Sequence, residues 1–198
     1  MNPLKNPWAT VLVGVILAVG ITLAMGASGN GLSLTIWLHV IVGITWIGLL
    51  YYFNFVQVPA VAAALADKEP GPAAINKYVA PRALLYFRWA AVATWLTGVS
   101  GLAQIGGGMD GIVNAFMLTG GMERIGVGAW LGTIMLFNVW VFIWPNQKKI
   151  LGMVSAAPEE IAKAKVVALY ASRTNTLLSI PMLMSMVGFG HGGFLPMG

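Results

Sequence analysis

The chain has 198 residues, a length that suits one domain. Hydrophobic residues make up 58% of it and charged residues only 9%, against roughly 25% charged residues in an ordinary soluble domain. So few charges cannot cover a water-facing surface, and an integral membrane protein is expected. The formal charge is +5 and there is no Cys. No basic run alternates with aromatic residues, so nucleic acid is not an expected partner. The lack of Cys excludes disulfides, thiolate metal sites and a covalently attached c-type haem.

Five apolar stretches approach or exceed the roughly 20 helical residues that cross a hydrocarbon core. They predict an all-α fold, a polytopic transmembrane helical bundle of about five spans that forms a single transmembrane domain over residues 1–198. The first stretch is long and lacks an obvious small-residue cleavage site, so we expect a retained span and not a removed signal peptide. The approximate spans are 7–25, 33–56, 84–105, 125–144 and 167–190.

The connections between the stretches differ in character. The first, 26–32, is short and uncharged, and the second is polar. The third is Gly-rich and predicts a short surface helix around 112–118. The fourth predicts an amphipathic piece over 158–165. Within the spans, Asn54, Gln57 and Asn138 are expected to form hydrogen bonds across helices.

The positive charges predict the orientation. With five spans, nine Lys and Arg residues fall on or near one side and Arg124 falls on the other, which places the N-terminus in the cytoplasm and the C-terminus outside. The nine are Lys5, Lys68, Lys77, Arg82, Lys148, Lys149, Lys163, Lys165 and Arg173.

The chain has two histidines, His39 and His191, and this topology places both at the outer face. Two neutral imidazoles are common axial ligands of b-type haem. Gly43 follows His39 by one helical turn on the same face, and Trp46 continues that face. Gly190 adjoins His191, and the glycines leave little side-chain bulk against a large planar ligand. The alternative is that each histidine forms a hydrogen bond with a carbonyl group or water near the interface. Likewise, Arg124 either neutralises a haem propionate or is a plain interfacial arginine.

Four segments follow one another in an order that is typical of a known family: TIWLHVIVGITWIGLLYYFNFVQ (35–57), YFRWAAVATWLTG (86–98), VGAWLGTIMLFNVWVFIWPNQKK (127–149) and NTLLSIPMLMSMVGFGHGG (175–193). Together they resemble the urate oxidase N-terminal membrane-domain family, the membrane part of bacterial membrane-bound urate oxidases. Relatives tend to carry further His where this chain has Ala and Arg, and the two His that match the family pattern are His39 and His191.

The resemblance implies a multi-pass protein of the bacterial inner (plasma) membrane and a redox role. The function we expect is a b-haem-binding electron-transfer subunit with its site near the outer face. His39 and His191 would be the metal ligands, Gly43, Trp46 and Gly190 would line the cofactor, and Arg124 would face a propionate. Quinol or a separate cytochrome c would be redox partners, and self-association or association with other membrane subunits is expected. Two alternatives stay open: a non-catalytic accessory subunit of a larger respiratory-type membrane complex, and a membrane component of a purine-oxidising system. An enzyme activity of this chain alone is not expected.

Overall fold

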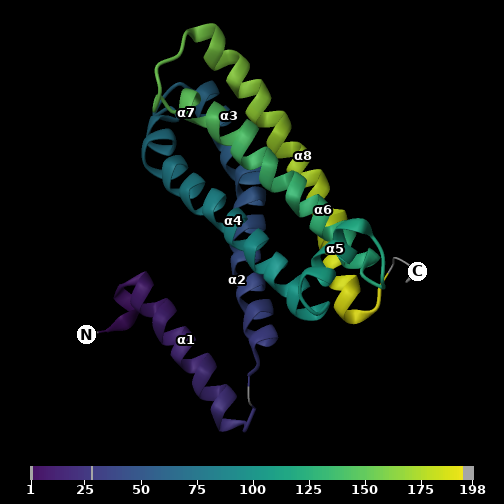
Figure 1. Ribbon diagram of the computed structural model, residues 1–198. Helices are drawn as coiled ribbons and strands as arrows, with labels where there is room; N and C mark the ends of the chain where they lie inside the picture. Colours follow the sequence, from purple (N-terminus) through teal and green to yellow (C-terminus); the bar gives the residue numbers. More distant parts are fainter. Residues whose placement is uncertain (1, 28, 194–198) are drawn as a thin grey trace. The chain divides into compact units, whose positions relative to one another are not determined.

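The computed structural model describes residues 2–27 and 29–193, and within them the chain forms helices and no strand (Figure 1). The predicted all-α class is therefore confirmed. The chain divides into two compact units, residues 1–34 and 35–198.

The first unit contains a short 3₁₀ turn, Pro3–Lys5, and the helix α1, Pro7–Ala24. The Asn6 side chain starts α1, because its Oδ1 accepts a hydrogen bond from the Trp8 amide at 2.9 Å. Pro7 occupies the first helical position, where a missing N–H costs nothing. No residue of α1 is buried and its mean hydropathy is 2.1, so the whole circumference of the helix suits lipid.

The second unit begins within α2. The helices α6 and α8 run alongside each other, and α5 lies beside the end of α4 and the start of α6 (Figure 1). The short helix expected around 112–118 is α5. The amphipathic piece expected over 158–165 forms the first two turns of α8, which continues without a break into the fifth predicted span. The bounds are α2, Gly31–Tyr52; α3, Val58–Asp67; α4, Ala80–Ile105; α5, Met109–Met117; α6, Glu123–Phe137; α7, Trp144–Ile150; and α8, Pro158–His191.

Three helical stretches contain a wide π-helical segment, and each segment is followed two residues later by a proline. The ring of a proline within a helix clashes with the carbonyl group four residues earlier. In all three cases that carbonyl group lies inside the π segment, so the wider turn relieves the clash. The segments are Phe53–Gln57, Ile75–Val79 and Asn138–Ile143, followed by Pro59, Pro81 and Pro145. Pro181 inside α8 has no such segment.

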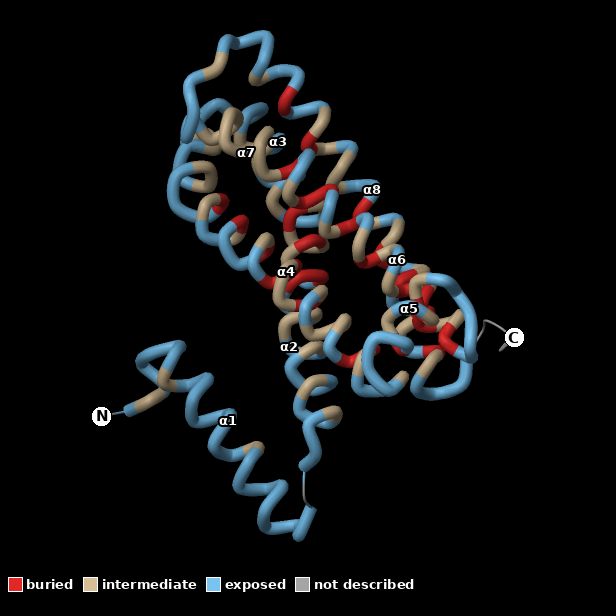
Figure 2. The backbone as a smooth tube through the Cα atoms, viewed as in Figure 1, coloured by how far each residue is buried: buried red, intermediate tan, exposed pale blue. Residues whose placement is uncertain are grey.

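The core of the second unit lies where α2, α4, α6 and α8 face one another (Figure 2). Trp46, Leu50, Phe87 and Met135 are each at most 1% exposed. By contrast, large apolar side chains such as Leu177, at 68% exposed, point outward. An apolar exterior of this kind suits a lipid environment.

Three helical stretches in the described residues are long and apolar enough to cross a membrane: Pro7–Ala24, Gly31–Asp67 and Glu123–Ile150. They correspond to the first, second and fourth predicted spans. The helices α4 and α8 cover the other two, but they carry more polar residues, including Arg88 and Arg173. Five spans are therefore not confirmed.

Candidate functional site

His39 lies on α2 and packs against α4. Its Nδ1 is 2.9 Å from the Thr94 carbonyl oxygen and 3.1 Å from Thr97 Oγ1. The Thr97 hydroxyl also donates to the Ala93 carbonyl oxygen at 2.7 Å, which leaves its oxygen free to accept from the imidazole. The histidine ring is thus fixed by two partners on a neighbouring helix.

The carbonyl partner determines which nitrogen of His39 carries the hydrogen. A carbonyl oxygen only accepts, so Nδ1 must be the donor. The neutral imidazole then has a lone pair on Nε2, and no described residue forms a hydrogen bond with Nε2. An Nδ1–H bond to a backbone carbonyl group is the usual way of orienting a histidine that binds a metal through Nε2. The same bond also matches the alternative in which His39 is a structural, hydrogen-bonded residue.

Two glycines face this contact. A Cβ atom placed on Gly98 would lie 3.1 Å from His39 Cε1, so the absence of a side chain there admits the ring. A Cβ atom on Gly43 would lie 3.8 Å from Thr94 Cγ2. Gly43 therefore shares the helix face of His39, as predicted, but Thr94 already fills the space over it at an ordinary contact distance.

Trp46 continues the same face into the core and is 1% exposed. It packs in a cluster with Leu50, Phe87 and Met182. Its Nε1 is buried and has no hydrogen-bond partner among the described residues. An indole N–H in that state costs free energy unless another group accepts its hydrogen.

Arg124 lies in the first turn of α6 and contacts the last turns of α8. Its Nη1 donates to the Gly188 carbonyl oxygen at 2.9 Å, where a cation also complements the negative end of the helix dipole. Ser185 Oγ donates to the Arg124 carbonyl oxygen and accepts from the Gly128 amide. The guanidinium therefore binds the end of α8, and its predicted role toward a propionate stays a prediction.

His191 is the last residue of α8 and is exposed, as is Gly190. The chain reverses directly after it, since a Cβ atom on Gly193 would lie 2.5 Å from Gly188 Cα. A Cβ atom on Gly190 would meet nothing within 4 Å. The structure shows no contact between the two imidazoles, and the described residues contain no group of three or more His, Cys, Asp or Glu that could hold a metal ion.

The two histidine-bearing segments nevertheless lie at one end of the second unit. Gln104 near the end of α4 donates to Thr35 at the start of α2 at 2.8 Å. The end of α4 then touches α5, where a Cβ atom on Gly106 would lie 2.1 Å from Gly111 Cα. From α5 the contacts continue to the start of α6 and, through Arg124, to the end of α8.

The inner face of α8 carries a row of polar residues that bind the other helices. Asn138 Nδ2 donates to Asn175 Oδ1 at 2.9 Å, and Asn175 Nδ2 donates to the Met135 carbonyl oxygen at 3.0 Å. Asn54 Nδ2 donates to Ser172 Oγ at 2.8 Å. The cross-helix bonds expected of Asn54 and Asn138 are present. Gln57 differs, since its Oε1 is buried without a partner among the described residues.

The partners of His39 were not found by sequence reasoning. Thr94, Thr97 and Gly98 lie within the segment 86–98 that resembles the family, and their spacing places them on adjoining turns of one helix. The sequence signal for these partners is therefore a Thr-x-x-Thr-Gly pattern in a span. From the sequence alone, this pattern indicates only close packing of two helices.

The helical fold and the apolar stretches long enough to span a membrane place the chain among membrane-associated helical proteins. Its candidate site is a histidine fixed between two of the helices. Residues 112–194 match the family model described as urate oxidase N-terminal. This is the family that the sequence segments resemble, so the resemblance is confirmed over that part of the chain. Neither a curated protein nor a solved structure matches the chain.

Proposed function

We propose that this chain is a b-haem-binding electron-transfer subunit of a membrane oxidoreductase related to the urate oxidase membrane domain. The proposal rests on the orientation of the His39 imidazole. Its Nδ1 is held by the Thr94 carbonyl oxygen at 2.9 Å, which leaves the Nε2 lone pair for a metal. An imidazole inside a helix that can span a membrane is a candidate functional residue by default.

The residues present fit a haem ligand set by type. His39, whose ring is oriented by α4, and His191 would hold the haem iron, with Gly190 leaving open space at the end of α8. Trp46 lies on the same face of α2 as His39, and its buried Nε1–H has no acceptor among the described residues. Bound haem would supply one-electron transfer, with its potential set by burial, hydrogen bonds and nearby charge. Quinol and a separate cytochrome c are the proposed donor and acceptor, and the outer face of a bacterial inner membrane is the proposed location.

The experiment is a pyridine haemochrome assay with visible spectra on the purified chain, expressed with ample haem. His39→Ala and His191→Ala should each lose the low-spin spectrum because an axial ligand is removed. Met184→Leu, a conservative change on α8, is the matched control and should keep it. If the wild-type chain holds no haem, or if both histidine variants keep an unchanged low-spin spectrum, the ligand assignment is wrong.

A second candidate function is a non-catalytic accessory subunit of a larger membrane complex. A groove of about 410 Å³ between α4 and the stretch Glu123–Ile150 favours it, because its lining is almost wholly apolar and rich in aromatic side chains. A neighbouring transmembrane helix would cover such a surface. A haem-free chain that co-purifies with a defined set of membrane subunits would support this function. The groove is lined by Val92, Trp95, Thr133, Leu136, Phe137, Trp140 and Val141.

A third candidate is a membrane component of a purine-oxidising system that uses a separate cytochrome c, and the family match over 112–194 favours it. The test is reduction of added cytochrome c on addition of urate. Reduction by membranes that contain the chain, and not by membranes that lack it, would support this candidate.

A further inference from the structure

A polar pocket of about 260 Å³ lies between α7 and the first three turns of α8, away from both histidines in the sequence. Two of its lining side chains are lysines and one is a carboxylate. The lining residues are Asn146, Lys149, Glu160, Lys163, Ala164 and Val167.

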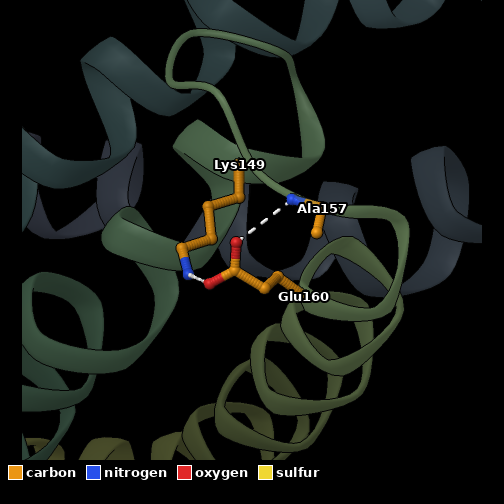
Figure 3. A network of polar contacts seen from close by, with 3 residues as sticks. All are labelled: Lys149, Ala157 and Glu160. Carbon is orange, nitrogen blue, oxygen red and sulfur yellow. Dashed lines mark hydrogen bonds and ion pairs between the residues drawn. The ribbon is translucent and has the colours of Figure 1, made fainter.

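Both oxygens of the carboxylate in this pocket have partners within the chain. Glu160 Oε1 accepts from Lys149 Nζ at 3.0 Å, and its Oε2 accepts from the Ala157 amide at 3.1 Å (Figure 3). The second bond closes the first turn of α8, where an acidic residue also complements the helix dipole. The negative charge of Glu160 is therefore shared between the Lys149 ammonium and the first turn of α8.

Lys163 is different, because no described carboxylate lies within ion-pair distance of it. The Lys149 ammonium has further hydrogens beyond the one that meets Glu160. Asn146 Nδ2 donates one hydrogen to the Phe142 carbonyl oxygen at 2.7 Å and has a second. The pocket therefore has an excess of donors and one uncompensated positive charge, which matches an anion.

The pocket also lies at the end of a stretch that can cross a membrane. The stretch Glu123–Ile150 ends one residue after Lys149. Trp144 begins α7, and the Arg88 guanidinium carbon of α4 lies 3.8 Å from the centre of its ring. Beyond Lys163 on α8, Tyr170 is 67% exposed. Aromatic residues beside basic ones at the end of a span mark the headgroup level of the bilayer.

We propose that this pocket binds the phosphate of an acidic phospholipid headgroup, with Lys163 and Lys149 as its counterions. Basic pockets at the ends of transmembrane helices are suited to such headgroups, because the phosphates lie at that depth. The lipid would join α7 to α8 beside the ion pair between Lys149 and Glu160, which links the same two helices. This proposal is independent of the haem proposal.

The experiment measures thermal unfolding of the full chain in nanodiscs of phosphatidylcholine, with increasing fractions of phosphatidylglycerol. Lys163→Gln should weaken the phosphatidylglycerol-dependent stabilisation, with an apparent affinity about fivefold lower, while Lys163→Arg should retain it. Lys165→Gln is the matched control. It removes the same charge from the same helix, and Lys165 is exposed but does not line the pocket.

Three results would overturn the proposal. Equal effects of Lys163→Gln and Lys165→Gln would mean that the lipid responds only to diffuse surface charge. An absence of any preference for phosphatidylglycerol over phosphatidylcholine would mean that no such site exists. Equal stabilisation by inorganic phosphate in pure phosphatidylcholine would show a site for free phosphate and not for a lipid. Equal unfolding temperatures of all variants in pure phosphatidylcholine would confirm that the substitutions leave the fold intact.

Discussion

The buried pair Asn138 and Asn175 offers a quantitative test of how the helices are held together. Asn175 is 0% exposed and forms two cross-helix hydrogen bonds, one to the Asn138 side chain and one to the Met135 carbonyl group. Hydrogen bonds between helices in a membrane contribute about 0.6 kcal/mol each on average and at most about 1.7 kcal/mol. Asn175→Ala removes both and leaves the Asn138 amide and the carbonyl group without these partners, so a loss of about 1–3 kcal/mol in the free energy of unfolding is expected.

The assay is reversible unfolding in mixed micelles, followed by far-ultraviolet circular dichroism, on a double-mutant cycle of Asn138→Ala and Asn175→Ala. The coupling energy should be about 0.5–1.7 kcal/mol, because one bond joins the two side chains directly. Leu177→Ala is the control, since that side chain is 68% exposed on the same helix and should cost less than about 0.5 kcal/mol. Strictly additive single substitutions would refute the inferred bond.

Three further predictions concern other parts of the chain. In the same unfolding assay, Gly98→Ala should lower the free energy of unfolding by about 1 kcal/mol more than the matched change Gly48→Ala does. The reason is that a Cβ atom at Gly98 would lie 3.1 Å from the His39 ring, whereas one at Gly48 would meet nothing within 4 Å. Hydrogen bonds from Lys149 and from the N-cap amide of α8 lower the pKa of Glu160. The ionised Glu160 therefore stabilises the fold above the ordinary carboxyl pKa, and this stabilisation is lost as the pH falls through the lowered pKa. Glu160→Gln should remove this part of the acid-induced loss of stability, measured in a pH series of unfolding curves. Reporter fusions at Gly107 and Lys149 should lie outside and inside the cell respectively, and the reverse result would contradict the predicted orientation.

The positions of the helices could be predicted from the sequence because apolar length is a strong signal. The sequence predicts the first span at 7–25, and the helix is Pro7–Ala24. Which helices cross the membrane could not be fixed in the same way. In α8, residues such as Asn175 and Ser179 lower the mean hydropathy while facing inward at 0% exposure, and a one-dimensional pattern does not show that direction.

The π-helical segments were missed although a signal for them exists. Pro59, Pro81 and Pro145 each follow such a segment by two residues, and a proline inside a long apolar helix points to a local distortion. Pro181 shows why the signal is not sufficient, since α8 continues past it without a π segment.

The candidate site was predicted less completely than the fold. The shared face of His39 and Gly43 follows from helical periodicity, and both lie against Thr94 in the structure. The choice of partner helix does not follow from periodicity, so the orienting role of Thr94 and Thr97 could not be foreseen. The same limit applies to Arg124, whose bond to the Gly188 carbonyl oxygen joins residues 64 positions apart.

The central claim is that the His39 imidazole, oriented by the Thr94 carbonyl group, ligates a b-type haem. The most direct measurement is a reduced-minus-oxidised visible spectrum of the purified chain, expressed with ample haem and compared with His39→Ala prepared in parallel. We expect the wild-type chain to show the sharp bands of a low-spin b-type haem, and the variant to lose them because one axial ligand is gone. A wild-type spectrum without haem bands, or a variant spectrum identical to that of the wild type, would contradict the account.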